Sequence, residues 1–359
     1  MIKAADYSPI VLIIDWKAPS PIFEEFEGIK VVRWRIRGFH EEMNLLERLI
    51  YAVWRKQFRY QFKKFCNAYN VEFINYHYPQ TSAFSLCASI ENSGINIPVC
   101  LSFHGTDVSS LASLLPAQID TWRKFVAGVE NVVVCSNDLG QKLVRMLDIK
   151  MKYQTLYSGV DVKSMCANVI NKSKSQDRII LNIAKFEEQK GQLTLLLAFS
   201  ELADDYPGLR LVFVGAQDKE LAILEERVKL LGLTEVVNFH TNVEHTKIGE
   251  FYKDAEIFCL PSKNEGFGLV LLEAGAFELP VLASSVGGIP ELIDNRNNGM
   301  LFKAGDIKAL SKSLRYLLDD PAAAKQMGRV LHEQVVSNFS WESLCAKYTA
   351  IARKRGGNG

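Results

Sequence analysis

The chain alternates short β-branched runs with longer amphipathic stretches along almost its whole length, and this alternation limits the folds open to it. Helical periodicity fills the stretches between the apolar runs, as in 193–202, 219–231 and 307–318. The runs are, in order, PIVLIID, IKVVRWRI, VEFINYHY, IPVCLSFHG, NVVVCSN, YQTLYSG, RIILNIAK, LRLVFVG, VVNFHT, AEIFCLPS, LPVLASS and GMLFKAG. Such alternation predicts parallel sheets covered by helices and joined by right-handed crossovers.

The length of the chain predicts two domains, because 359 residues exceed what one hydrophobic core comfortably serves. The polar stretch 162–178 has the composition of a linker. A cut there predicts an α/β protein with two doubly wound, Rossmann-like domains, over 1–165 and 166–339, that face a central cleft. Ligands of such sheets bind at the carboxyl ends of the strands.

The composition excludes several classes of protein. The seven cysteines are scattered and never form a C-x-x-C pair, which predicts reduced thiols in a cytoplasmic protein, with neither a disulfide framework nor a zinc site. No apolar run approaches the roughly 20 residues that cross a bilayer, and the start of the chain lacks the arrangement of a signal peptide. No Asp-x-Asp and no His/Cys/Asp cluster at metal spacing occurs, so we expect no metal and no cofactor.

The stretch PSKNEGFGLVLLEA, residues 261–274, carries the most informative pair of acids. A buried strand ends at Pro261, and a glycine turn with Glu265 then leads into a helix. Glycines let a backbone approach a ligand closely, and the first turn of a helix offers free N–H groups to an anion. Glu273 lies about 2.2 helical turns beyond Glu265 and points back toward the same side. Two such carboxylates can hold hydroxyls of one extended ligand, such as a sugar nucleotide. The alternative is an ordinary turn whose glutamates only cap and solvate the helix.

A second loop carries two cations, Lys185 and Lys190, in the stretch NIAKFEEQKGQ. Both follow a predicted parallel strand, so their charge-assisted hydrogen bonds suit a diphosphate. A solvated basic loop is the alternative interpretation. If a diphosphate leaves during a reaction, these lysines and a helix N-terminus would neutralise it without a divalent ion.

With these motifs the sequence resembles the retaining glycosyltransferases of family 4, which have the GT-B architecture. Glu265 and Glu273 match the E-x7-E motif of that family, Lys190 and Gly191 match its Lys-Gly, and Lys185 stands where the family usually has Arg. SSVGGIPELI, residues 284–293, matches the loop after the next strand. SFHGTD resembles the family's His-Gly-x-Asp, and YSGVD resembles Asn-Gly-Val-Asp with Ser158 in place of Asn. The stretch IIDWKAPSPIF departs from the family because it lacks the usual glycine pair.

The resemblance implies a hexosyltransferase-type, metal-independent enzyme that moves a sugar from a UDP- or GDP-sugar to a hydroxyl of a glycan, a glycolipid or a small-molecule glycoside precursor. Such enzymes serve cell-envelope or polysaccharide biosynthesis. It also implies that a helix over about 340–356 crosses back to the first domain. The catalytic residues that it implies are Glu265, Lys185, Lys190 and His104. The donor-binding residues are Gly266, Phe267, Gly268, Leu269 and Glu273, with Val243 beside the base.

Two other functions stay open. A sugar-nucleotide 2-epimerase-like isomerase has the same two-domain fold, although the setting of the E-x7-E motif here is that of the transferases. A non-catalytic sugar-nucleotide-binding partner subunit would also fit the altered N-terminal loop. The sequence argues against a dinucleotide dehydrogenase because no G-x-G-x-x-G follows an early strand.

The basic segment 30–64 suggests a further partner. It holds ten Lys/Arg against three Glu, whereas the net charge of the whole chain is only +1. Residues 45–65 place apolar side chains at near-helical spacing among these cations. One interpretation is a helix that lies at the inner face of an anionic membrane or guides an acidic acceptor. The other is a Rossmann helix with an apolar core face and a charged solvent face. The segment has no nucleic-acid motif.

Overall fold

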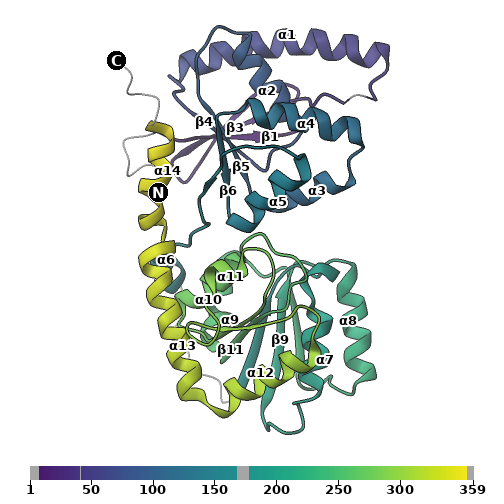
Figure 1. Cartoon of the computed structure of the whole chain (residues 1–359), viewed down its shortest axis with the longest axis vertical. Coiled ribbons are helices and arrows are strands. Elements are labelled where there is room, and N and C mark those ends of the chain that lie inside the picture. Colours follow the sequence, from purple (N-terminus) through teal and green to yellow (C-terminus); the bar gives the residue numbers. More distant parts are fainter. Residues whose placement is uncertain (1–7, 41, 168–177, 354–359) are drawn as a thin grey trace. The chain divides into compact units, whose positions relative to one another are not determined.

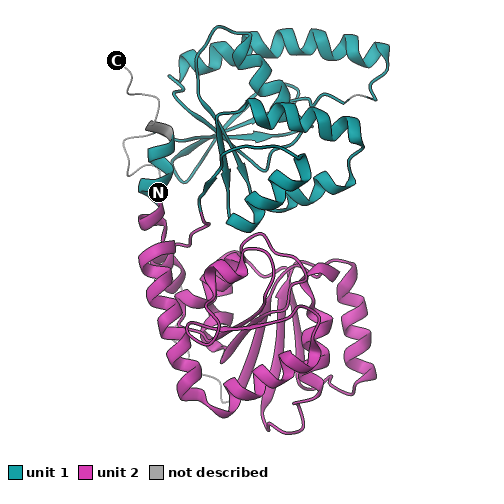
Figure 2. Ribbon diagram, viewed as in Figure 1, with its two compact units in different colours: residues 1–156, 345–359 teal, residues 157–344 magenta. Residues whose placement is uncertain are grey.

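The computed structural model describes residues 8–40, 42–167 and 178–353, and the chain divides into two compact units (Figure 2). Unit 1 comprises residues 1–156 and 345–359, and unit 2 comprises residues 157–344. The first residues of the predicted linker, 162–167, form helix α6 (Val162–Ala167) in unit 2, and its residues 168–177 lie outside the described residues.

Unit 1 contains two sheets (Figure 1). The first has the order β1-β3-β2 and is built from β1 (Ile10–Ile14), β2 (Ile22–Phe26) and β3 (Ile29–Trp34). The second is wholly parallel, with the order β4-β5-β6-β7: β4 (Ile74–His77), β5 (Val99–Phe103), β6 (Asn131–Val134) and β7 (Gln154–Thr155). The helices are α1 (Leu45–Ala68), α2 (Ser82–Glu91), α3 (Thr106–Ser110), α4 (Pro116–Gly128) and α5 (Asn137–Leu147), with a 3₁₀ turn at Leu111–Ser113.

Strand β2 is a departure from the predicted all-parallel pattern. It pairs antiparallel with β3, and Glu27 and Gly28 form the turn between them with φ of 50° and 70°. Two successive residues with positive φ suit the right-handed twist of a tight hairpin. All five residues of β2 are exposed, so no apolar run marked this edge strand in the sequence.

Unit 2 is a six-stranded parallel sheet with the order β10-β9-β8-β11-β12-β13. Numbered within the unit, this order is 3-2-1-4-5-6, the arrangement of a dinucleotide-binding Rossmann fold. The strands are β8 (Arg178–Ile183), β9 (Leu209–Gly215), β10 (Val237–Thr241), β11 (Ile257–Leu260), β12 (Val281–Ser284) and β13 (Met300–Phe302). β11 is buried at every position and β8 at its last four, as expected for strands covered on both faces.

Helices cover both faces of this sheet (Figure 1). They are α7 (Gln192–Ser200), α8 (Lys219–Leu230), α9 (Ile248–Asp254), α10 (Leu269–Ala276), α11 (Ile289–Leu292), α12 (Ile307–Asp319) and α13 (Pro321–Gln334), with 3₁₀ turns at Glu188–Lys190 and His245–Lys247 and a π turn at Val335–Phe339. Leu195 and Phe199 of α7 pack with Leu314 of α12 on the strands in one buried cluster. The three helices expected in this half lie within two residues of their predicted bounds.

The last helix, α14 (Trp341–Arg353), belongs to both units. Its first residues fall in unit 2 and the rest in unit 1, where Ile351 and Tyr348 pack against Cys100, Val133 and Leu156. Among the described helices, none combines the length and the apolar character needed to span a bilayer.

Candidate functional site

The sheet order of unit 2 brings two loops together. β8 and β11 are neighbours, with Ile257 paired to Ile180, yet the chain continues from β8 to β9 on one side and from β11 to β12 on the other. The loops that leave the carboxyl ends of these two strands therefore diverge and open a binding position between them. The first loop holds residues 184–191, and the second holds residues 261–268. Both predicted motif loops thus lie at the topological switch point.

Close contact between the two loops requires Gly191. Its φ is +68°, and a Cβ there would lie only 2.1 Å from the carbonyl oxygen of Pro261. Only glycine combines this conformation with this approach at no steric cost. The loop is held from behind by Gln192, whose Nε2 donates to the carbonyl of Lys185 at 3.1 Å. The Lys-Gly pair of the sequence therefore fixes where Lys190 emerges.

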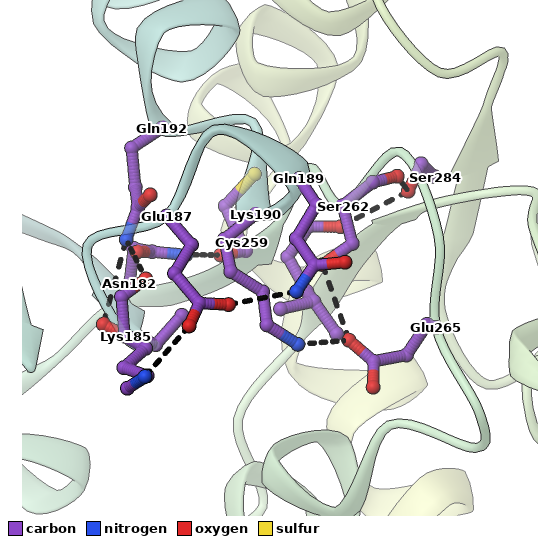
Figure 3. A network of polar contacts seen from close by, with 12 residues as sticks. Asn182, Lys185, Glu187, Gln189, Lys190, Gln192, Cys259, Ser262, Glu265 and Ser284 are labelled. Carbon is purple, nitrogen blue, oxygen red and sulfur yellow. Dashed lines mark hydrogen bonds and ion pairs between the residues drawn. The ribbon is translucent and has the colours of Figure 1, made fainter. Parts of the chain in front are cut away.

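Lys190 and Glu265 form an ion pair across these loops (Figure 3). Their Nζ and Oε2 atoms are 2.9 Å apart, and the two side chains are only 22% and 17% exposed. Ser262, which is fully buried, donates its hydroxyl to the same Oε2 at 3.2 Å. Ser284 in turn donates to the carbonyl of Ser262. Residues 75 positions apart are thus held as one partly desolvated charge pair, where electrostatic interactions are stronger than in open water.

Lys185 lies on the same loop but has other partners. Its Nζ is 2.7 Å from Glu187 and 3.5 Å from Asp218, and about half of its side chain is exposed. The hydrogen bond to Glu187, more than any other contact, raises the pKa of Lys185 above its ordinary value. Gln189 donates to the other oxygen of Glu187 at 2.7 Å. The structure therefore keeps Lys185 cationic, and it does not pair Lys185 with either glutamate of the E-x7-E motif.

The glycine turn after β11 ends at the N-terminus of α10. Gly268 has a φ of +92° and is the N-cap of that helix. Gly287, from the loop after β12, packs against the turn so closely that a Cβ there would lie 1.8 Å from the carbonyl oxygen of Glu265. The amide of Leu271 donates to the carbonyl of Gly268 at 2.9 Å. The two amides before it open the helix, at the position where helix N-termini bind anions.

Two residues of this turn point in different directions. The side chain of Phe267 is buried and stacks on Tyr157, with ring centroids 5.1 Å apart. Phe267 can therefore contact a ligand only through its backbone. Leu269, the first residue of α10, is 43% exposed. Of the predicted ligand contacts, that of Phe267 is therefore limited to the main chain, whereas the side chain of Leu269 is also accessible.

Glu273 has a different partner from Glu265. The hydroxyl of Tyr252, a fully buried residue of α9, donates to its Oε2 at 2.7 Å. Burial raises the pKa of Glu273 above its ordinary value, while the Tyr252 hydrogen bond and the charge of His245 oppose that rise. His245 lies two residues after Val243, beyond β10. The loop predicted to lie beside the nucleotide base therefore also holds a residue whose charge lowers the pKa of Glu273.

His104 lies in unit 1, directly after β5. The carboxylate of Asp107 accepts hydrogen bonds from the amides of His104, Gly105 and Val108 at 2.7–2.9 Å. Gly105 has a φ of 131°, outside the range that side-chain-bearing residues adopt. Burial raises the pKa of Asp107, and the three amides oppose that rise. The Asp of the His-Gly-x-Asp motif therefore shapes the loop that presents His104.

Several site residues were missed by sequence reasoning. Ser262 stands inside the quoted P-S-x-x-E stretch, so its position next to Glu265 could have drawn attention to it. Tyr252 and Asp218 come from other crossovers, and no spacing marks them. Within the described ranges, no group of three or more His, Cys, Asp or Glu side chains could hold a metal ion.

Both halves of the chain match sequence models of glycosyltransferases. Residues 10–164 match the sequence model of Glycosyltransferase Family 4, and residues 168–331 match that of Glycosyl transferases group 1. The glycogen synthase of Mycobacterium tuberculosis is 24% identical over 271 residues, which cover 73% of this chain and 64% of that protein. This chain therefore spans less than two thirds of that relative.

Solved structures with the same fold cover nearly the whole chain. Sucrose-phosphate synthase from Thermosynechococcus elongatus aligns with a TM-score of 0.78 at 22% identity, over 99% of this chain and 91% of that chain. HepE of Anabaena, solved in complex with UDP, aligns with a TM-score of 0.72 at 15% identity, over 90% of this chain and 86% of that chain. These alignments confirm the predicted architecture of two Rossmann-like domains.

Proposed function

The chain belongs to glycosyltransferase family 4, and we propose that it transfers a sugar from a nucleotide-diphosphate sugar to a hydroxyl acceptor with retention of the anomeric configuration. The observation that carries this proposal is the Lys190–Glu265 ion pair beside the N-terminus of α10, at the switch point of unit 2. A cation, a carboxylate and the backbone amides at a helix N-terminus together match the phosphate and hydroxyl groups of such a donor.

On the donor side, each group has a distinct task. Glu273 binds the ribose hydroxyls, and Glu265 binds hydroxyls of the sugar. The amides of 266–269 hold the diphosphate. Lys190 and Lys185 neutralise the charge that develops as the nucleotide leaves, so the step needs no divalent ion. His104 donates a hydrogen bond to the sugar.

We favour a UDP-sugar as the donor, with a GDP-sugar as the alternative. HepE, which has the same fold, was solved with UDP. The base lies at the loop after β10, where Val243 is half-buried. The acceptor is a glycan, a glycolipid or a small-molecule glycoside precursor.

Ligand binding tests the donor class. Thermal unfolding is measured with UDP, GDP and ADP and their common sugar conjugates, in the presence of EDTA. A ligand at about 100 times its dissociation constant adds about 2.7 kcal/mol, a shift of about 2–4 °C. Lys190→Met should abolish the shift, whereas the matched control Lys229→Met, on an exposed position of α8, should keep it. No shift with any nucleotide at millimolar concentration would refute donor binding.

Product analysis separates transfer from the alternatives. Incubation of the donor without an acceptor should release free nucleotide and sugar slowly, and the released sugar should first appear in the donor's own anomeric form. An isomerase would instead convert the sugar nucleotide into an isomer without cleaving it. A non-catalytic binding subunit would leave the donor intact.

We also infer that α1 holds the protein against an anionic membrane at the cytoplasmic face. Helix α1 has two apolar faces, one buried and one exposed, and the spacing of apolar residues in the sequence did not distinguish them. Phe58, Phe62 and Cys66 are buried in unit 1. Aliphatic side chains in the first half of the helix are instead exposed: Leu45, Leu46, Leu49, Ile50 and Val53. Arg48, Arg55 and Lys56 flank them on the exposed surface.

Apolar side chains beside cations match a bilayer surface of acidic headgroups. Each basic residue near such a surface contributes about 1 kcal/mol, and each inserted leucine adds hydrophobic transfer energy. Vesicles with and without phosphatidylserine test this at low salt. Leu46→Ser/Leu49→Ser/Ile50→Ser should lose binding to the acidic vesicles, while the control Leu230→Ser, at an exposed leucine of unit 2, should keep it. Equal binding by both variants would exclude α1 as the docking surface.

A further inference from the structure

A chain of polar side chains leads through unit 1 to His104. The hydroxyl of Ser102 donates to Oδ1 of Asn75 at 2.7 Å. Nδ2 of Asn75 lies 3.0 Å from Nε2 of His77, and Nδ1 of His77 lies 2.9 Å from Nε2 of His104. Asn75 and His77 are on β4, Ser102 is on β5, and His104 follows β5. The carboxyl ends of two paired strands therefore carry one continuous hydrogen-bonded row.

The surroundings of both imidazole rings favour the neutral form. The surrounding protein and, after it, the adjacent His104 ring lower the pKa of His77 to about 4. Burial also lowers the pKa of His104. A neutral imidazole has one N–H donor and one lone-pair acceptor, so each contact in the row has a defined direction.

The direction follows from Asn75. Its Nδ2 can only donate, so Nε2 of His77 accepts and the proton of His77 is on Nδ1. That proton is donated to Nε2 of His104, which leaves the proton of His104 on its own Nδ1. Within the described part of the chain, Nδ1 of His104 has no partner.

The orientation of the His104 ring is fixed as well. The ring of Tyr78 stacks on it with a centroid distance of 4.4 Å. Tyr78 has a φ of +52°, a conformation that is uncommon for a bulky residue and marks a position determined by its surroundings. His104 thus has one face against Tyr78 and one nitrogen bound by His77.

We propose that His77 and Asn75 are positioning residues that hold His104 as the Nδ1–H tautomer, so that it offers a ligand a hydrogen-bond donor and no lone pair. His104 can then bind a hydroxyl or another oxygen through Nδ1–H, and it cannot remove a proton there. Only the identification of that oxygen as one of the donor sugar rests on the proposed function. The tautomer itself rests on contacts within unit 1.

NMR of the full chain with ¹⁵N-labelled histidine tests the tautomer directly. The sequence has only six histidines, and protonated and bare ring nitrogens resonate far apart. The spectrum of His104→Gln assigns the ring. We expect Nδ1 to be protonated and Nε2 bare in His104 of the unmodified protein. A protonated Nε2 would overturn the proposal.

Two variants of His77 separate positioning from general packing. His77→Leu cannot donate to His104, so the Nε2–H form of His104 should gain population. His77→Asn keeps an amide donor near the position of Nδ1 and should restore the Nδ1–H form. An unchanged His104 spectrum in a folded His77→Leu variant would overturn the proposal, because the tautomer would then not depend on His77.

Binding measurements connect the tautomer to the sugar. The ratio of the affinities for UDP-glucose and UDP should fall about fivefold in His77→Leu and recover in His77→Asn, as expected for one neutral hydrogen bond. A changed tautomer with an unchanged ratio would show that His104 does not donate to this sugar. Absence of UDP binding by the unmodified protein would contradict the proposed function and leave the NMR result decisive for the tautomer.

Discussion

Removing one oxygen atom, in Tyr252→Phe, tests how the carboxylate of Glu273 is stabilised. The Tyr252 ring is fully buried and stacks on Phe277, so phenylalanine keeps the packing and creates almost no cavity. What is lost is the 2.7 Å hydrogen bond to Oε2 of Glu273, together with a longer contact of 3.4 Å to the carbonyl of Val270. A hydrogen bond to a charged group contributes about 1.5–3 kcal/mol. We expect the free energy of unfolding to fall by about 2 kcal/mol at neutral pH.

The pH dependence of this loss is the sharper part of the prediction. Burial raises the pKa of Glu273 above its ordinary 4.5, so folding favours the protonated form. The contribution of this group is therefore fully present below about pH 4.5 and is lost as the pH rises through the folded-state pKa. The hydroxyl of Tyr252 limits that loss. Without it the folded-state pKa rises further, so the variant should lose more stability at neutral pH than at pH 4.

Urea unfolding at about pH 4 and about pH 7.5 measures both values. The matched control is Tyr51→Phe, because the hydroxyl of Tyr51 is also buried but contacts the neutral hydroxyl of Ser85 at 2.7 Å. Its cost should be about 1 kcal/mol and independent of pH. Combining Tyr252→Phe with Glu273→Gln should remove the pH dependence. Equal costs for Tyr252→Phe at both pH values would refute the reasoning.

Three further predictions concern the loops around Glu265. Glu265→Gln and Lys190→Met should each reduce the rate of sugar transfer at least about a hundredfold. Because the ion pair is partly exposed, each variant should lose only about 1–2 kcal/mol of unfolding free energy. Turnover and urea unfolding, measured on the same samples, check both values. Gly287→Ala should lower the free energy of unfolding by more than about 2 kcal/mol, because the new Cβ would meet the carbonyl of Glu265. The control Gly232→Ala has a similar φ, and its Cβ would meet no atom within 4 Å, so it should cost about 1–2 kcal/mol in the same urea titration. Chelation of divalent metals should leave turnover unchanged, and a loss that added magnesium restores would contradict charge neutralisation by the lysines.

Much of the fold could be predicted because its pattern is local. Parallel strands covered on both faces need continuous apolar runs, and β8, β11 and β12 have them. β2 was missed because all its residues are exposed and its pairing depends on a two-residue turn. Helix α1 was predicted as a helix, but periodicity alone did not show that its apolar positions divide between two faces.

In the candidate site, too, local features could be predicted and contacts between distant segments could not. The positions of Lys190, Glu265 and Glu273 followed from short motifs, because a strand, a turn and a helix N-terminus are contiguous in sequence. Their partners did not follow. Tyr252 reaches Glu273 from α9, and Asp218 reaches Lys185 from the loop after β9, since the sheet order and not the spacing brings them together. Pairings of this kind depend on tertiary structure, which one sequence does not specify residue by residue.

The two glutamates of the E-x7-E motif differ in their hydrogen-bonding partners, and this difference suits the different roles proposed for them. Glu273 is held by a neutral phenol that has no mobile charge, so its position does not depend on the state of a bound phosphate. Glu265 is held by Lys190, a cation that a diphosphate can also attract. In the proposed transfer, negative charge that develops on a leaving phosphate would draw Lys190 toward it, and Glu265 would lose part of its neutralising partner. Glu265 would then become a stronger acceptor for a sugar hydroxyl, or would better stabilise positive charge on the sugar ring, when the bond breaks. In the proposed reaction, the ion pair would couple charge on the leaving group to the carboxylate assigned to the sugar, which a neutral partner such as Tyr252 could not do.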